Sequence, residues 1–85
     1  MNHIHYTRHA RTKFEILRQY GFEVTLAQVE ETILNPEKVI PQPENRFIAQ
    51  KTISAEHVLR VVFRYQGETR VVITFYPGRR ERYAD

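Results

Sequence analysis

The sequence contains no cysteine, which excludes a disulfide framework and any metal site built on thiolates. Small secreted domains normally depend on such cross-links, so the composition favours a reducing compartment, and we expect a cytoplasmic protein. Glycine-rich phosphate loops and serine-nucleophile motifs are absent as well. We therefore do not expect the activities that depend on those motifs.

Long apolar runs are also missing, and residues 1–14 lack the apolar core of a signal peptide. We accordingly expect an untargeted chain that has no membrane partner. The 85 residues leave room for one modest core, and a hydrophobic fraction of 41% is enough to form it. The prediction is one domain over residues 1–85.

The formal net charge is +3, but the charge is unevenly distributed along the chain. Residues 21–45 are acidic, whereas residues 46–85 contain twice as many basic as acidic side chains. The basic residues of that second segment are Arg46, Lys51, Arg60, Arg64, Arg70, Arg79, Arg80 and Arg82. A basic segment of this kind suits RNA or another polyanion.

Two helices are expected in the N-terminal half of the chain. Apolar residues recur at helical spacing over residues 8–20, after Thr7 as N-cap, and Gly21 suits the left-handed residue that ends a helix. Residues 25–28, Thr-Leu-Ala-Gln, form the pattern of a capping box, and the second helix ends before Pro36.

Four strands are expected after the helices, because the period of the apolar residues changes to two. They are Lys38–Ile40, Arg46–Ile53, Val58–Tyr65 and Thr69–Tyr76, with residues 66–68 as the last turn. Residues 2–6 are either a short edge strand or a leading arm, since their alternation is too short to decide. We therefore predict an α+β fold with two N-terminal helices packed on a four-stranded, mainly antiparallel sheet.

Alternation assigns the side chains of the last hairpin to two faces. The expected core face carries Leu59, Val61, Phe63, Tyr65, Val71, Ile73 and Phe75. The expected outer face carries Arg60, Val62, Arg64, Arg70, Val72, Thr74 and Tyr76. A three-residue loop would set Arg60 opposite Thr74.

The outer face combines guanidinium groups, which bind phosphate, with an aromatic ring on which a base can stack. Arg60, Arg64, Arg70 and Tyr76 are therefore candidate RNA-binding residues. A solvated sheet face whose arginines keep the protein soluble and its edges unpaired explains the same pattern equally well.

A second basic cluster lies at the start of the first helix. His9 and Lys13 are one turn apart and share a side of the helix, with Arg8 and Arg11 nearby. Cations at a helix N-terminus oppose the helix dipole, a departure from local stability that functional sites often show. The alternative is an ordinary surface pair of Arg11 with Glu15.

No metal site is expected. His3 and His5 alternate near the N-terminus and suggest a site with His9, but carboxylate or thiolate ligands at defined spacing are lacking. A solvated histidine pair is the simpler interpretation.

The order of elements, with Thr7-Arg-His9-Ala10 at the start and Val72-Ile-Thr74-Phe-Tyr76 at the end, resembles the toxin-like domains related to RelE and ParE. The likeness runs from about Tyr6 to Tyr83. Within it, the segment from Val29 to Pro36 resembles the family's second helix, and Leu59-Arg60-Val61-Val62 resembles its penultimate strand.

This resemblance implies a metal-independent, cofactor-free ribonuclease fold of the kind shared by barnase-like and RelE-like toxins. In that class the ribose 2′-hydroxyl attacks the adjacent phosphate, and the protein supplies base, acid and cation. The residues that would surround the phosphate are His9, Lys13, Arg60, Thr74 and Tyr76. The basic residues expected along the rest of the RNA are Arg8, Arg11, Arg46, Arg64, Arg70, Arg79 and Arg80.

The resemblance also implies a small antitoxin protein that covers the arginine face. Some members of the wider group poison DNA gyrase by protein contact and cleave nothing. A non-catalytic inhibitor or nucleic-acid-binding module is therefore the alternative function. A homodimer formed through the sheet face is a third interpretation.

Overall fold

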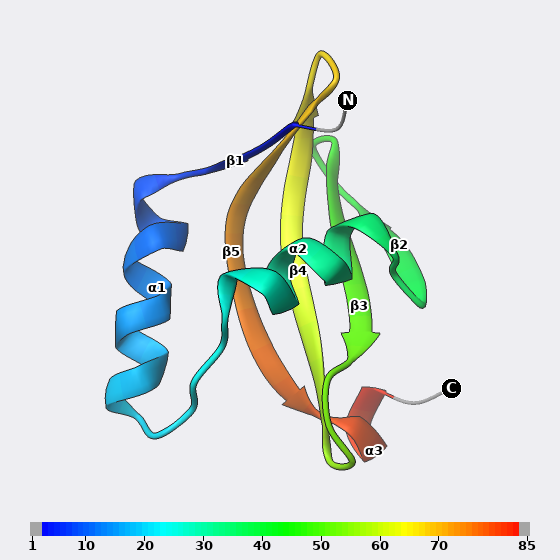
Figure 1. Ribbon diagram of the computed structural model, residues 1–85. Coiled ribbons are helices and arrows are strands. Elements are labelled where there is room, and N and C mark those ends of the chain that lie inside the picture. Colours follow the sequence, from blue (N-terminus) through cyan, green and yellow to red (C-terminus); the bar gives the residue numbers. More distant parts are fainter. Residues whose placement is uncertain (1–2, 84–85) are drawn as a thin grey trace.

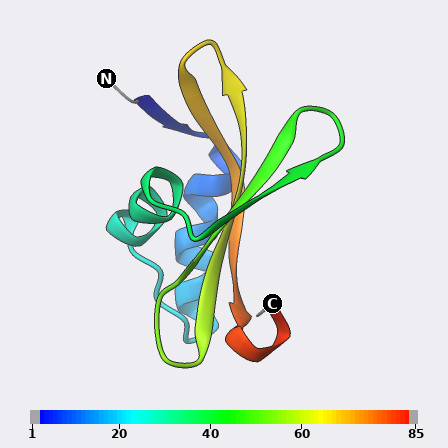
Figure 2. The same cartoon turned by 90° about the vertical axis from the view of Figure 1, so that its right-hand side faces the viewer.

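The computed structural model describes residues 3–83 and contains one five-stranded sheet with the strand order β1-β5-β4-β3-β2. The elements, in chain order, are β1 (His3–Tyr6), α1 (Arg8–Gln19), α2 (Leu26–Leu34), β2 (Lys38–Gln42), β3 (Arg46–Thr52), β4 (His57–Gln66), β5 (Thr69–Arg79) and α3 (Arg80–Tyr83). Helices α1 and α2 cover one face of the sheet, and α3 lies on the other side (Figures 1 and 2). The predicted α+β class is confirmed.

The predicted count of two helices on four strands was wrong. The segment left undecided at the N-terminus forms β1, which pairs in parallel with β5 from His3 opposite Thr69 to Tyr6 opposite Val72. Asn2, which the expected segment included, lies outside the described residues. The sheet is therefore mixed, and α3 is an additional helix that its four residues were too few to reveal by periodicity.

Strand β5 is also longer than predicted. The prediction ended it at Tyr76, before Pro77, yet the strand continues to Arg79. The partner β1 reaches only as far as Val72, so the later part of β5 is a sheet edge. Proline is tolerated there because an edge strand does not need every backbone donor.

The helix ends follow the local sequence signals. The Thr7 hydroxyl accepts a hydrogen bond from the Ala10 amide at 3.1 Å, and the predicted capping box of α2, made by Thr25 and Gln28, is confirmed. Gly21 follows α1 with a φ of +83°, the left-handed conformation expected of it. Thr7 does more than cap the helix, since its hydroxyl donates to the Ile73 carbonyl of β5 at 3.1 Å.

The core lies between the two larger helices and the centre of the sheet. Its buried members are Ala10, Val24, Val29, Ile33, Leu59, Val61, Val72 and Phe75. Burying these apolar side chains fixes α1 and α2 on what we call the helix face of the sheet, and leaves the opposite face open. None of the helices within residues 3–83 is long and apolar enough to cross a membrane.

A β-bulge at Ile73 alters the predicted register of the last hairpin. The turn contains two residues, Gly67 and Glu68, because Gln66 pairs with Thr69. The register then shifts, so that Phe63 pairs with Val72 whereas Val62 pairs with Thr74. A bulge adds one unpaired residue and interrupts the alternation from which the faces were predicted.

Three predicted faces and one predicted pairing were wrong for this reason. Val72 is fully buried in the core instead of exposed, and Arg70 lies on the helix face, where its guanidinium carbon is 5.5 Å from the centre of the Tyr65 ring. Val71, which was predicted on the core face, lies on the open face, where it is still buried. Arg60 lies opposite Tyr76, not opposite Thr74.

The Tyr6 hydroxyl is buried beneath the helices and has no hydrogen-bond partner among the described residues. Burial raises the pKa of Tyr6 to about 12, and the negative charge of Glu30 acts in the same direction. An unfolded tyrosine loses its proton near pH 10. As the pH rises from 10 towards 12, the unfolded state releases this proton first, so Tyr6 lowers stability across that interval.

We predict that Tyr6→Phe raises the free energy of unfolding at neutral pH by about 1 kcal/mol, because it removes an unsatisfied buried hydroxyl. The decline in stability between pH 10 and 12 should also become shallower. Urea unfolding at a series of pH values measures both effects. Tyr20→Phe is the matched control, since Tyr20 is 84% exposed and should change neither quantity. A Tyr6→Phe protein that is less stable than this control would contradict the prediction.

Candidate anion-binding site

The open face of the sheet is built from paired residues that alternate with the core positions. One row across it contains Lys38, Gln50, Arg60 and Tyr76. The next row contains Ile40, Ile48, Val62 and Thr74, and the row beyond contains Gln42, Arg46, Arg64 and Val71. Short helix α3 lies on this side of the sheet, at one end of the strands (Figure 2).

Arg60 is the central group of this face and is only 9% exposed. Its Nε donates a hydrogen bond to the Tyr76 hydroxyl at 3.0 Å, and its Nη1 donates to Gln50 Oε1. The guanidinium carbon lies 4.2 Å from the centre of the Tyr83 ring and 5.8 Å from that of Tyr76. The arginine is therefore held by two neutral acceptors and two aromatic faces.

None of the groups within residues 3–83 that hold Arg60 carries a negative charge. Within residues 3–83 no ion pair includes it, although a buried cation is costly unless it is paired. Cation–π contacts and neutral hydrogen bonds compensate only part of that cost. The guanidinium is therefore a favourable partner for an anion, and for phosphate in particular, whose oxygens match its paired N–H groups.

Two residues of this site, Gln50 and Tyr83, were not predicted from the sequence. Gln50 Nε2 donates to the Tyr83 carbonyl at 3.2 Å, and the Arg80 amide donates to the Glu56 carbonyl at 2.7 Å, so both bonds hold α3 in place. The Tyr83 ring lies against Gly78, where a side chain would overlap it. A glycine inside a strand signals such close approach and was the available sequence clue.

The structure brings together some of the predicted site residues on the open face. Tyr76 contacts Arg60 directly, and Thr74 lies one pair further along β5. Arg46 and Arg64 lie opposite each other in the row beyond, where Arg64 Nη1 donates to Gln66 Oε1 at 3.2 Å. Arg70 is excluded from this group by the bulge.

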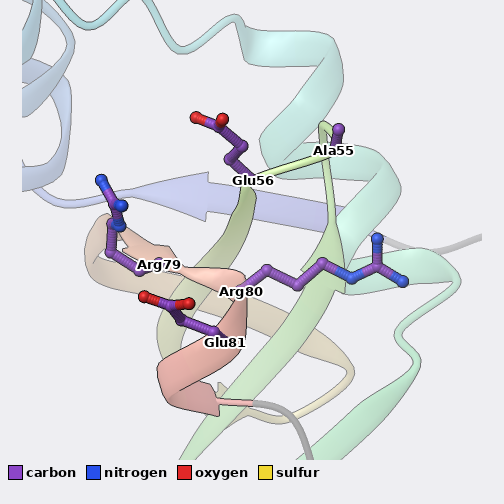
Figure 3. Close-up of a pocket in the computed structure, with 5 residues that line it drawn as sticks. All are labelled: Ala55, Glu56, Arg79, Arg80 and Glu81. Carbon is purple, nitrogen blue, oxygen red and sulfur yellow. The ribbon is translucent and has the colours of Figure 1, made fainter.

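Arg79 and Arg80 lie where β5 passes into α3. Their side chains diverge, as Figure 3 shows, and with Ala55, Glu56 and Glu81 they line a cavity of about 360 Å³. Two carboxylates therefore accompany two guanidinium groups, which makes this cavity less positive than the row of Arg46 and Arg64.

The predicted residues of α1 lie in the helix layer. His9 and Lys13 occupy one flank of the helix, whereas Arg11 lies on the other flank, beside a cavity that Glu23 also lines. Among residues 3–83, neither His9 nor Lys13 has a hydrogen bond or ion pair with Arg60, Thr74 or Tyr76. The structure thus does not bring His9 and Lys13 into contact with the predicted residues of the sheet.

The ion pairs of α1 decide one alternative from the sequence. Glu15 pairs with Arg18, so the expected pair of Arg11 with Glu15 was wrong. Arg8 is exposed at the start of α1.

His3 and His5 line an open cavity with Thr69 and Val71. Residues 3–83 contain no group of three or more histidine, cysteine or acidic side chains placed to hold a metal ion.

No protein-family model matches this sequence, and no curated protein has significant similarity to it. A search of solved structures finds a similar fold in BrnT, a ribonuclease toxin of Brucella abortus. The two structures superpose with a TM-score of 0.61 at 21% sequence identity, over 92% of this chain and 96% of BrnT. At this identity the likeness concerns the fold.

We predict that Gly78→Ala displaces the Tyr83 ring and exposes Arg60, because the new methyl group would overlap the ring and the ring is the movable partner. The guanidinium should then react several-fold faster with phenylglyoxal, as mass spectrometry of peptides can measure. Arg64, which lies away from Tyr83, is the internal control and should react at an unchanged rate. An unchanged rate at Arg60 would contradict the described role of Tyr83 as its cover.

Proposed function

We propose that this chain is an RNA-cleaving toxin of a toxin–antitoxin system, with the open face around Arg60 as its phosphate site. The observation that carries the proposal is the buried Arg60 guanidinium, which has only neutral partners among the described residues. The fold supports it, since BrnT is a ribonuclease toxin of the same general architecture. The proposed relation to RelE and ParE toxins rests on the sequence motifs.

In this proposal the ribose 2′-oxygen bonds to the adjacent phosphorus and the bond from phosphorus to the 5′-oxygen breaks, which leaves a 2′,3′-cyclic phosphate and a 5′-hydroxyl. No metal ion is needed because side chains supply the base, the acid and the cation. Arg60 binds the scissile phosphate and stabilises the negative charge that develops on it. The Tyr76 hydroxyl lies next to that phosphate and can transfer a proton to the departing oxygen, while Thr74 orients a phosphate oxygen. Each of these groups acts from the same face of β4 and β5.

His9 and Lys13 contribute in this proposal only if the RNA passes over the free edge of β5. Helix α1 runs beside that strand (Figure 1), and β1 leaves the edge uncovered beyond Val72. His9 can then act as the base that accepts the proton of the attacking 2′-hydroxyl, and Lys13 can neutralise a flanking phosphate.

The remaining RNA would follow the basic rim of the open face. Arg46 and Arg64 continue the path beyond Arg60, and Arg79 and Arg80 extend it towards α3. Phosphate contacts of this kind give affinity without sequence preference. We further propose that a small antitoxin protein silences the toxin by covering this rim, and that both act in the cytoplasm.

Cleavage of a mixed-sequence RNA in EDTA tests the proposal. The wild type should cleave, and Arg60→Ala should slow cleavage by about 10²- to 10³-fold, the usual cost of removing one group that stabilises transition-state charge. His9→Ala reports whether α1 takes part. Arg18→Ala removes the same charge from an exposed position and should cleave at the wild-type rate. Intact RNA at high wild-type concentration, or equal cleavage by all variants, would overturn the assignment.

A non-catalytic RNA-binding module is the second candidate. It is favoured by one observation: among residues 3–83, the titratable side chains that contact Arg60 are tyrosines, with no histidine or carboxylate among them. This candidate predicts binding without product.

A salt titration of RNA binding tests Arg60 under both candidates. The slope of log K against log salt should be shallower for Arg60→Ala than for the wild type by about 0.7, the value expected for one phosphate contact on a single strand. An unchanged slope would remove Arg60 from the RNA interface.

A further inference from the structure

Gln50 is the least expected member of the Arg60 site, because a buried guanidinium is most often paired with a carboxylate. The residue lies in the middle of β3, is 6% exposed, and is paired directly with Arg60 across the sheet. Glutamate has the same length and shape. The position therefore offers room for a carboxylate that the sequence does not use.

Both ends of the Gln50 amide are engaged. Its oxygen accepts from Arg60 Nη1, and its nitrogen donates to the Tyr83 carbonyl of α3 at 3.2 Å. A reversed amide would direct its N–H groups at the guanidinium and lose both bonds. These two contacts therefore fix the amide, and through it the plane of the arginine.

We propose that Gln50 is a positioning residue that holds Arg60 with a neutral acceptor, so that the charge of the guanidinium stays available to a phosphate group of RNA. The inference rests on the proposed function, because it names how that phosphate site is kept receptive. A glutamate at position 50 would form a stronger, charge-assisted hydrogen bond with Arg60 and lose the neutral bond to the Tyr83 carbonyl. Hydrogen bonds to charged groups contribute more than neutral ones, so the net effect should stabilise the fold. The same bond would neutralise the cation and repel the phosphate.

This arrangement exchanges stability for binding. A buried cation that has only neutral partners among the described residues costs free energy in the unliganded protein, and binding of an anion offsets that cost. A merely structural glutamine would behave differently, since its replacement would alter stability and RNA affinity in the same direction. The proposal requires Gln50→Glu to raise stability and to lower RNA affinity.

The test compares Gln50→Glu and Gln50→Met with the wild type in two measurements, thermal unfolding and binding of a 2′-O-methyl RNA that cannot be cleaved. Gln50→Glu should raise the melting temperature and weaken binding by about tenfold or more, as expected when a charge-assisted contact is lost. Gln50→Met removes the holder without adding charge and should lower both. Gln19→Glu, exposed at the end of α1, makes the same charge change and should leave binding unaltered.

The outcomes separate this inference from the proposed function. If the wild type binds, Arg60→Ala does not, and folded Gln50→Glu binds as tightly as the wild type, the role of Gln50 is wrong and the phosphate site stands. If Gln50→Glu does not fold, undiminished binding by Gln50→Met overturns the role instead. If the wild type does not bind, or binds no better than Arg60→Ala, the phosphate site and the inference both fail.

Discussion

The register of β5 against β4, shifted by the bulge at Ile73, decides which residues of the last strand face the core and which face outward. The extra residue lets Val72 enter the core while Tyr76 faces Arg60 on the other side of the sheet. The Ile73 carbonyl also accepts a hydrogen bond from the Thr7 hydroxyl, which caps α1. Core packing, the helix start and the candidate site thus depend on one backbone irregularity, as is common where a bulge redirects side chains.

The electrostatics of the open face follow from this register. Arg60 is enclosed by tyrosine rings and by the Gln50 amide, which together exclude most water without supplying a counter-charge. Low exposure strengthens every interaction of the cation, including the one with a bound anion. Exposed arginines such as Arg46 interact with phosphate more weakly and are screened by salt. The buried position therefore suits selective recognition of one phosphate among many.

Local signals predicted the parts of the fold that depend on local physics. The caps at Thr7 and Thr25 and the turn of the chain at Gly21 are properties of a few neighbouring residues. Alternation alone placed Arg60 and Tyr76 on one face. It failed for Arg70, because a bulge has no marker in an unbroken run of strand-forming residues. Gln50 lies opposite Arg60 only once β3 has paired with β4, and Tyr83 reaches the site only once α3 folds back. Both positions therefore depend on contacts between separate segments of the chain.

The hydrogen bond from Thr7 to Ile73 has a consequence for how the chain folds. It joins residues 66 positions apart and links the first turn of α1 to the last strand. The parallel pairing of β1 with β5 spans a similar separation. Such long loops must close before their contacts contribute, which slows folding compared with a helical bundle of equal length. The two ends of the sequence therefore gain their structure together, and a change that loosens β5 also loosens the start of α1.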